Sequence, residues 1–363
     1  MMPLGIYIHM PFCAKKCPYC DFYSCNYSKE KAIKYAQAVI RDIECFDGDA
    51  AADTVYFGGG TPSLIPSELT ENILSAIRKK FRLENPEITI EINPCTVSKD
   101  KLLQYYNMGI NRLSVGIQSA NNNELELLGR NHTFETASAA ILNAYDCGFR
   151  NISADLMTGI PYQTFESIEA SVRKISELPV THISNYILKI EHGTPFDNPE
   201  FINSMPDDDF TSDMYLYMVK TLLNKGFRQY EISNFSKSGY ESRHNLKYWK
   251  CHEYIGFGPS AHSFCNGIRY YCPPDLDSFI NYPAKKIVTD DMAGSDEEKI
   301  MLALRLTEGI NLSNYSELKT SIIRKVKMLE KSGYINFNGD NISLTPKGFL
   351  VSNSIINELT DLI

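Results

Sequence analysis

Four cysteines lie close together near the start of the chain, and three of them have the spacing of a cluster site. Cys13, Cys17 and Cys20 form the pattern C-x3-C-x2-C directly after a short apolar run, and Cys25 follows. Three thiolates in one short loop can hold three irons of a cubane [4Fe-4S] cluster and leave the fourth iron open to a non-protein ligand. The pattern therefore predicts an iron–sulfur cluster on these three cysteines.

Two other interpretations of these cysteines are open. A structural zinc site requires four ligands and would add Cys25 or His9 to the three thiolates. Zinc sites built from cysteine usually pair C-x2-C units, however, and the sequence has no second unit of this kind. Free thiols without a role are less favoured, because thiols so close together oxidise easily. The other cysteines are dispersed and are expected to be inert.

The cysteines follow the first of a series of alternating strand-like and helical segments. Strands are expected at 5–10, 54–57, 87–92, 112–117, 152–157 and 182–190. Helices are expected at 29–46, 67–81, 98–107, 133–146 and 165–177. Such alternation implies a parallel sheet with right-handed crossovers. We therefore expect an α/β fold, a partial (β/α)6 barrel, with its chemistry where the strands end.

The chain divides into three expected regions. The barrel covers residues 1–195, and residues 196–290 form a connecting segment that includes a loop-and-turn stretch at 243–264. Residues 291–363 contain two helical stretches, two short strands joined by an Asn-Gly turn, and a closing helix. That order is typical of a small winged-helix-like α+β domain.

Charge and hydropathy limit the partners. The chain carries 36 basic and 44 acidic side chains, a formal net charge of −8, whereas nucleic acids and anionic membranes are bound by basic faces. The C-terminal unit has no basic stripe beyond Arg324, Lys325 and Lys327, so we expect it to pack against the barrel or a partner and not to bind nucleic acid. Neither a signal peptide nor a run of about 18 apolar residues is present. We therefore expect a cytoplasmic protein without a membrane segment.

Several segments together carry a family resemblance. They are YIHMPFC at 7–13, GGGTP at 58–62, EINP at 91–94, RLSVGIQS at 112–119 and DLMTGIP at 155–161. With the cysteine spacing, they make the chain similar to the radical S-adenosylmethionine superfamily, and within it to the oxygen-independent coproporphyrinogen III oxidase group. In that superfamily, S-adenosylmethionine chelates the open iron, and reduction of the cluster yields a 5′-deoxyadenosyl radical that abstracts hydrogen.

The resemblance implies which residues bind S-adenosylmethionine. Gly59, Gly60 and Thr61 follow the second strand, where backbone without side chains lets amides approach a ligand and form an anion-binding nest. A tight turn is the alternative for this segment. Glu91 would pair with a cationic part of the cofactor. Other positions that match are Tyr7, Tyr19, Gln118, Arg130 and Asp155, although each also has a structural explanation when taken singly.

Two departures separate the chain from the oxidases of this group. The oxidases have a further cysteine two residues after the third cluster ligand, where this chain has Phe22, and they have a longer N-terminal segment. Both features resemble the haem chaperones of the group. The segment HNLKYW at 244–249 also matches their H-N-x-x-Y-W element.

The resemblance thus implies a chaperone that binds haem, a [4Fe-4S] cluster and S-adenosylmethionine, and that passes haem to an acceptor protein, which can be a membrane protein. A neutral imidazole can ligate haem iron, so His244 is the candidate haem ligand. The alternative for this residue is a turn-stabilising hydrogen bond. The rival function is enzymatic: oxidative decarboxylation of two propionates of coproporphyrinogen III.

Overall fold

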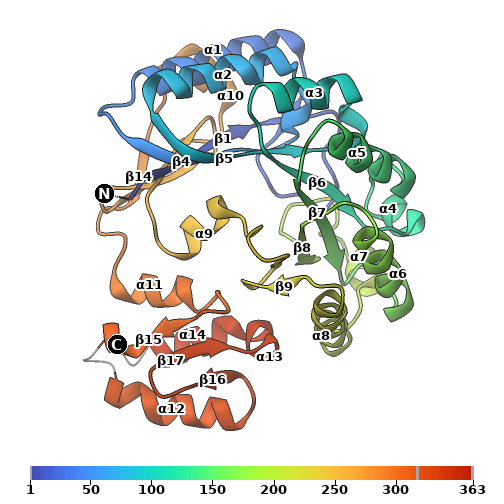
Figure 1. The fold of residues 1–363 in the computed structure, drawn as a ribbon, viewed down its shortest axis with the longest axis vertical. Helices are drawn as coiled ribbons and strands as arrows, with labels where there is room; N and C mark the ends of the chain where they lie inside the picture. The colour runs from blue at the N-terminus through green and yellow to red at the C-terminus, as the bar shows by residue number, and fades with distance from the viewer. Residues whose placement is uncertain (1, 316–318, 361–363) are drawn as a thin grey trace.

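The main element of the molecule is a curved sheet of 12 strands. The computed structural model describes residues 2–315 and 319–360. The sheet is rolled into an open barrel, and most helices cover its outer side (Figure 1). None of the helices in the described ranges is long and apolar enough to cross a membrane.

The six expected strands are all present and lie side by side in chain order. They are β1 (Leu4–Met10), β4 (Ala51–Gly59), β5 (Arg82–Ile92), β6 (Arg112–Gln118), β7 (Asn151–Thr158) and β8 (His182–Ile187). Each pairs in parallel with the next. Since parallel neighbours require a crossover, a helix lies between each pair along the chain. The expected partial barrel is confirmed.

The crossover helices bury one apolar face against this sheet. They are α1 (Lys29–Glu44), α2 (Ser67–Lys80), α3 (Lys99–Asn107), α5 (Phe134–Asp146) and α6 (Phe165–Ser176). In α1, Tyr35, Val39 and Ile43 are buried at intervals of about one turn. Shorter elements are β2 (Phe12–Cys13), β3 (Cys25–Asn26), α4 (Asn122–Leu127), α7 (Pro199–Ser204) and α10 (Leu276–Asn281).

Residues between 196 and 290 extend the sheet at both edges. Beside β1 lie β11 (Tyr254–Phe257), β12 (His262–Cys265), β13 (Ile268–Tyr271) and β14 (Ile287–Asp290). Beside β8 lie β10 (Asn234–Ser236) and β9 (Arg228–Gln229). Of these, β11 is parallel to β1, and the others are antiparallel to their neighbours. The helix α8 (Asp208–Asn224) packs on α6.

The expected loop-and-turn stretch at 243–264 is instead largely regular. It contains the helix α9 (Arg243–Trp249), followed by β11 and part of β12. Ser242 caps the helix, and the Glu87 carboxylate accepts hydrogen bonds from the backbone amides of Arg243 and His244. Because Glu87 is far from α9 in the sequence, this second cap cannot be predicted from the residues around the helix. Figure 1 shows α9 on the inner side of the curved sheet.

The C-terminal unit has a separate apolar core, to which Tyr215 of α8 also contributes. Its elements are α11 (Asp296–Ala303), β15 (Ile310–Asn311), α12 (Lys319–Lys331), β16 (Ile335–Phe337), β17 (Asn341–Leu344), α13 (Pro346–Leu350) and α14 (Ser352–Thr360). The strands form a small antiparallel sheet in the order β15-β17-β16. Backbone hydrogen bonds from Ile232 to Arg305 and from Thr307 to Tyr230 join this unit to the barrel.

Candidate functional site

A pocket of about 410 Å³ lies at the carboxyl ends of the parallel strands. Its lining comes from the cysteine loop and from the ends of β4 to β8, as expected for this fold. Most of the residues singled out in the sequence meet there, namely Cys13, Cys17, Tyr19, Cys20, Gly59, Gly60, Thr61, Glu91, Gln118, Arg130 and Asp155. Tyr7 and His244 are not among the lining residues.

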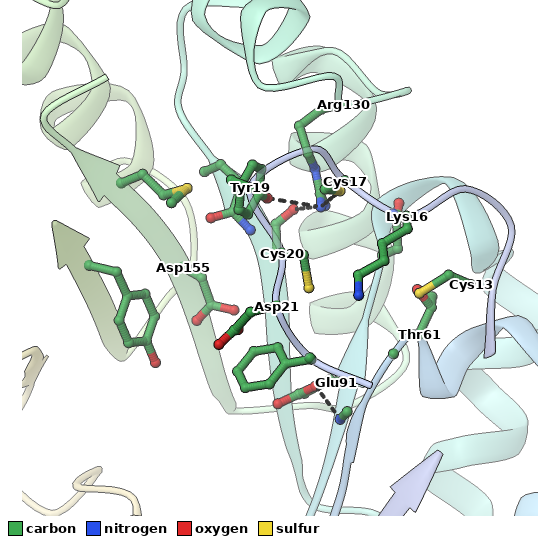
Figure 2. A pocket seen from close by; sticks show the side chains of 18 of the residues that line it. Cys13, Lys16, Cys17, Tyr19, Cys20, Asp21, Thr61, Glu91, Arg130 and Asp155 are labelled. Carbon is green, nitrogen blue, oxygen red and sulfur yellow. Dashed lines mark hydrogen bonds between the residues drawn. The ribbon is translucent and has the colours of Figure 1, made fainter. Parts of the chain in front are cut away.

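The three cysteines stand along the loop that covers one side of the pocket (Figure 2). Within the described residues, no three His, Cys, Asp or Glu side chains converge closely enough to hold a single metal ion. A cubane cluster attaches each thiolate to a different iron, so its ligands need not converge in this way. The three thiols around one pocket therefore fit a cluster better than a zinc ion.

The charge around these thiols favours an anionic cluster. The Arg130 guanidinium is 3.4 Å from the Cys17 sulfur, and it also donates to the carbonyl of Gly116 at 2.8 Å. Its Nε is buried and has no hydrogen-bond partner. An unpaired buried donor is costly, so Arg130 suits a ligand that supplies an acceptor. Burial raises the pKa of the Cys20 thiol, which a bound iron would offset.

The glycine segment does not form the expected nest of free amides. The amide of Gly60 donates to the Met10 carbonyl at 2.8 Å, and that of Thr61 donates to the Phe12 carbonyl at 2.8 Å. The amide of Gly59 donates to Glu91 at 3.2 Å. These amides already have acceptors, so the prediction of an anion-binding nest was wrong.

The glycines instead permit a close approach of two chain segments. Gly59 has a φ of +110°, and a Cβ there would lie 2.7 Å from the His9 ring. A Cβ on Gly60 would lie 2.8 Å from the Phe12 carbonyl oxygen. A side chain at either position would clash with the neighbouring segment, so only glycine fits. The backbone of both glycines lines the pocket.

Glu91 is a half-buried carboxyl at the end of β5. It accepts a hydrogen bond of 2.8 Å from the Tyr56 hydroxyl besides the one from Gly59. Burial outweighs these bonds and raises the pKa of Glu91 to about 7. A cationic ligand would restore the charged form of this side chain. Its position and environment therefore fit a partner for a positive group.

Asp155 and Gln118 complete the inner wall. The Ser114 hydroxyl donates to Asp155 at 3.2 Å, and burial raises the pKa of this carboxyl. Gln118 ends β6 with a φ of +75°, a conformation that non-glycine residues rarely adopt and that often marks functional sites. Both side chains offer hydrogen-bonding groups to a polar ligand.

Sequence reasoning missed much of the outer lining. The structure adds Lys15, Lys16, Asp21, Phe22, Ser114, Met157, Tyr186, Ile187, Leu188, Lys189 and Glu191. Several of these stand at or just after the end of β8, where the strand-end rule could have found them. Only Ser114 and Met157 fall within the quoted motifs, and Phe22 was noted only as a departure from the oxidases.

His244 and Tyr7 stand outside the pocket lining. His244 is 1% exposed; its Nδ1 is 2.8 Å from the Thr54 hydroxyl, and its Nε2 is 2.8 Å from that of Tyr248. Burial lowers its pKa to about 3, so the ring is neutral. Tyr7 bonds to His9 at 3.1 Å. Because both ring nitrogens of His244 are engaged, the structure supports the hydrogen-bonding alternative for this residue over haem ligation.

Comparisons with known proteins show the family to which the chain belongs. The model of the Radical SAM superfamily matches residues 7–175, and that of the HemN C-terminal domain matches residues 297–351. "Heme chaperone HemW" of Lactococcus lactis is 31% identical and covers 98% of this chain and 97% of its own length. The chain belongs to the HemW family. The HemW of Escherichia coli is 38% identical over 72% of this chain and 70% of its own length.

A solved structure supports the same architecture. "Coproporphyrinogen III oxidase (HemN) from Escherichia coli" superposes with a TM-score of 0.80 over 99% of this chain and 89% of its own. The identity is 21%, so this likeness concerns the fold alone. The radical S-adenosylmethionine fold expected from the motifs is confirmed for this HemW-family chain.

Proposed function

We propose that this chain is a haem chaperone. It holds a [4Fe-4S] cluster through Cys13, Cys17 and Cys20, binds S-adenosylmethionine in the pocket, binds haem, and delivers haem to an acceptor protein. The observation that carries this proposal is the similarity over nearly the whole chain to proteins named heme chaperone HemW.

The pocket supports the cofactor part of the proposal. Glu91 would pair with a cationic group of S-adenosylmethionine, and Arg130 would offer its unpaired Nε to an acceptor. Tyr19, Gln118 and Asp155 line the same cavity. When bound, the cluster would supply an electron to the sulfonium. The residues around it would orient the ligand.

Coproporphyrinogen III oxidation is the rival function. Its support is the shared fold with HemN, at 21% identity. Phe22 weighs against it, since the oxidases have a cysteine at this position. The acceptor of the haem stays unidentified, and a membrane protein is one class to test.

One anaerobic experiment separates the two functions. The cluster is reconstituted, and S-adenosylmethionine, dithionite and coproporphyrinogen III are added while porphyrin products are followed. Haem is titrated in parallel by its Soret absorbance. We expect haem binding without conversion, followed by haem transfer to an apo-acceptor. Conversion to protoporphyrinogen with multiple turnovers would overturn the chaperone proposal.

A further inference from the structure

Three large apolar side chains of the pocket lining are exposed to solvent, and we call the part of the pocket that they form its mouth. Phe22 is 63% exposed, Tyr186 is 44% exposed and Ile187 is 40% exposed. Phe22 follows the cysteine loop, and the other two end β8, so they reach the mouth from separate segments. Exposed apolar groups that converge at one opening indicate a binding surface for an apolar ligand.

Amines border the same mouth. Lys15 and Lys16 belong to the cysteine loop, and Lys16 extends toward the pocket (Figure 2). Lys189 follows β8 and pairs with Glu191 at 2.8 Å. Asp21 also lies at the mouth, so these amines outnumber the two carboxylates there. In a chain with a net charge of −8, this concentration of amines favours a ligand with acidic groups.

The size of the cavity decides where such a ligand can lie. A volume of about 410 Å³ is near the lower end of the range for ligand pockets, roughly 300–1,000 Å³. Under the proposed function, the cluster and S-adenosylmethionine occupy this space. A porphyrin must then lie outside it, across the opening.

We propose that haem binds across this mouth, with one face on Phe22 and Tyr186 and its propionates at Lys15, Lys16 and Lys189. This inference rests on the proposed function. Aromatic rings provide the flat apolar contact that a porphyrin face needs, and amines pair with its two carboxylates. Haem placed there would keep its other face open to an acceptor protein.

The test compares matched variants. The mouth variant carries Lys15→Glu, Lys16→Glu and Lys189→Glu, and the control variant carries Lys220→Glu, Lys327→Glu and Lys347→Glu. The control lysines are exposed and lie outside the pocket lining, and their reversal changes the net charge equally. A third variant, Phe22→Ser, removes the aromatic face alone.

Haem is titrated into each protein at low and high salt, with and without the cluster, and binding is followed by the Soret absorbance. Iron and sulfide contents and circular dichroism check the cluster and the fold. We expect the mouth variant to bind haem at least about tenfold more weakly and to lose the salt dependence of binding. Phe22→Ser should bind more weakly but keep the salt dependence, and the control should match the wild type.

The outcomes distinguish failure of the proposed haem site from failure of the proposed chaperone function. If the wild type binds haem and the mouth variant binds it equally well, the mouth is not the haem site, although the chaperone function stands. If the wild-type protein does not bind haem, the proposed function fails, and this inference fails with it.

Discussion

The Tyr56 hydroxyl donates a hydrogen bond of 2.8 Å to Oε1 of Glu91 in the wall of the pocket. The ring of the same tyrosine stacks on His244, with 5.1 Å between the ring centres. Tyr56 therefore connects the buried H-N-x-x-Y-W element to the carboxyl that we assign to S-adenosylmethionine. The geometry makes Tyr56 a positioning residue.

The first prediction concerns the pH dependence of S-adenosylmethionine binding. Glu91 has a pKa of about 7; burial and Asp155 raise it, whereas Tyr56, Gly59 and Arg112 lower it. A cationic cofactor binds the carboxylate form, so affinity should increase as pH rises through about 7. Tyr56→Phe removes a bond that favours the carboxylate and should move the midpoint upward by about one pH unit.

Isothermal titration of S-adenosylmethionine between pH 6 and 9 measures this midpoint. A variant that weakens binding equally at every pH would contradict the role of Tyr56 on Glu91.

The second prediction concerns the cluster ligands. Each of the single substitutions Cys13→Ala, Cys17→Ala and Cys20→Ala should prevent assembly of the full cubane during anaerobic reconstitution. In each variant one iron lacks its thiolate ligand. Cys25→Ala is the matched control: its sulfur bonds to the Pro11 carbonyl at 3.3 Å, and it does not line the pocket. Iron and sulfide analysis measures the outcome. Full cluster content in Cys20→Ala would show that the ligand set is wrong.

The parallel strands and the cysteine loop could be predicted because their signals are local. Each strand is a short β-branched run between helical periodicities, and the three thiols lie within one loop. The family resemblance then selected distant residues such as Glu91 and Asp155, and both line the pocket at the strand ends.

What could not be predicted depends on contacts between distant segments. The glycine amides are occupied because the pairing of β4 with β1 continues beyond Gly59, so that Gly60 bonds to Met10 and Thr61 bonds to Phe12. No motif encodes this register. The sequence around His244 resembles a loop, because its helix is capped in part by Glu87 from β5. The outer lining at Tyr186 was missed because the strand was expected to run to residue 190, whereas β8 ends at Ile187.

The third prediction concerns the stability cost of adding a side chain at Gly59. It separates the cost of a steric clash from the cost of backbone strain. Gly59 and Gly239 both have positive φ, but a Cβ on Gly59 would strike the His9 ring, whereas one on Gly239 meets nothing within 4 Å. Gly239→Ala should cost about 1–2 kcal/mol of unfolding free energy from strain alone. Gly59→Ala should cost roughly 1–3 kcal/mol more because of the clash. Urea unfolding of the cluster-free proteins measures both, and equal losses would refute the packing argument.

The fourth prediction concerns the role of His244 in stability. His244→Leu would leave the buried hydroxyls of Thr54 and Tyr248 without this partner, and we expect a loss of roughly 2–3 kcal/mol. His192→Leu is the control, since the His192 side chain is fully exposed and its loss should change stability by less than about 0.5 kcal/mol. The folded His244→Leu protein should bind haem as the wild type does.

The pH dependence of the unfolding free energy provides a second test of the role of His244. The pKa of His244 is about 3 in the folded protein, whereas the unfolded chain takes up its proton near the ordinary value of 6.5. The unfolded state thus binds more protons between these values, so wild-type stability should fall as pH decreases through this window, by at most about 1.4 kcal/mol per unit from this residue. His244→Leu should lack that contribution. A variant that stays folded, keeps the wild-type pH slope and loses the Soret shift on haem addition would instead make His244 a haem ligand.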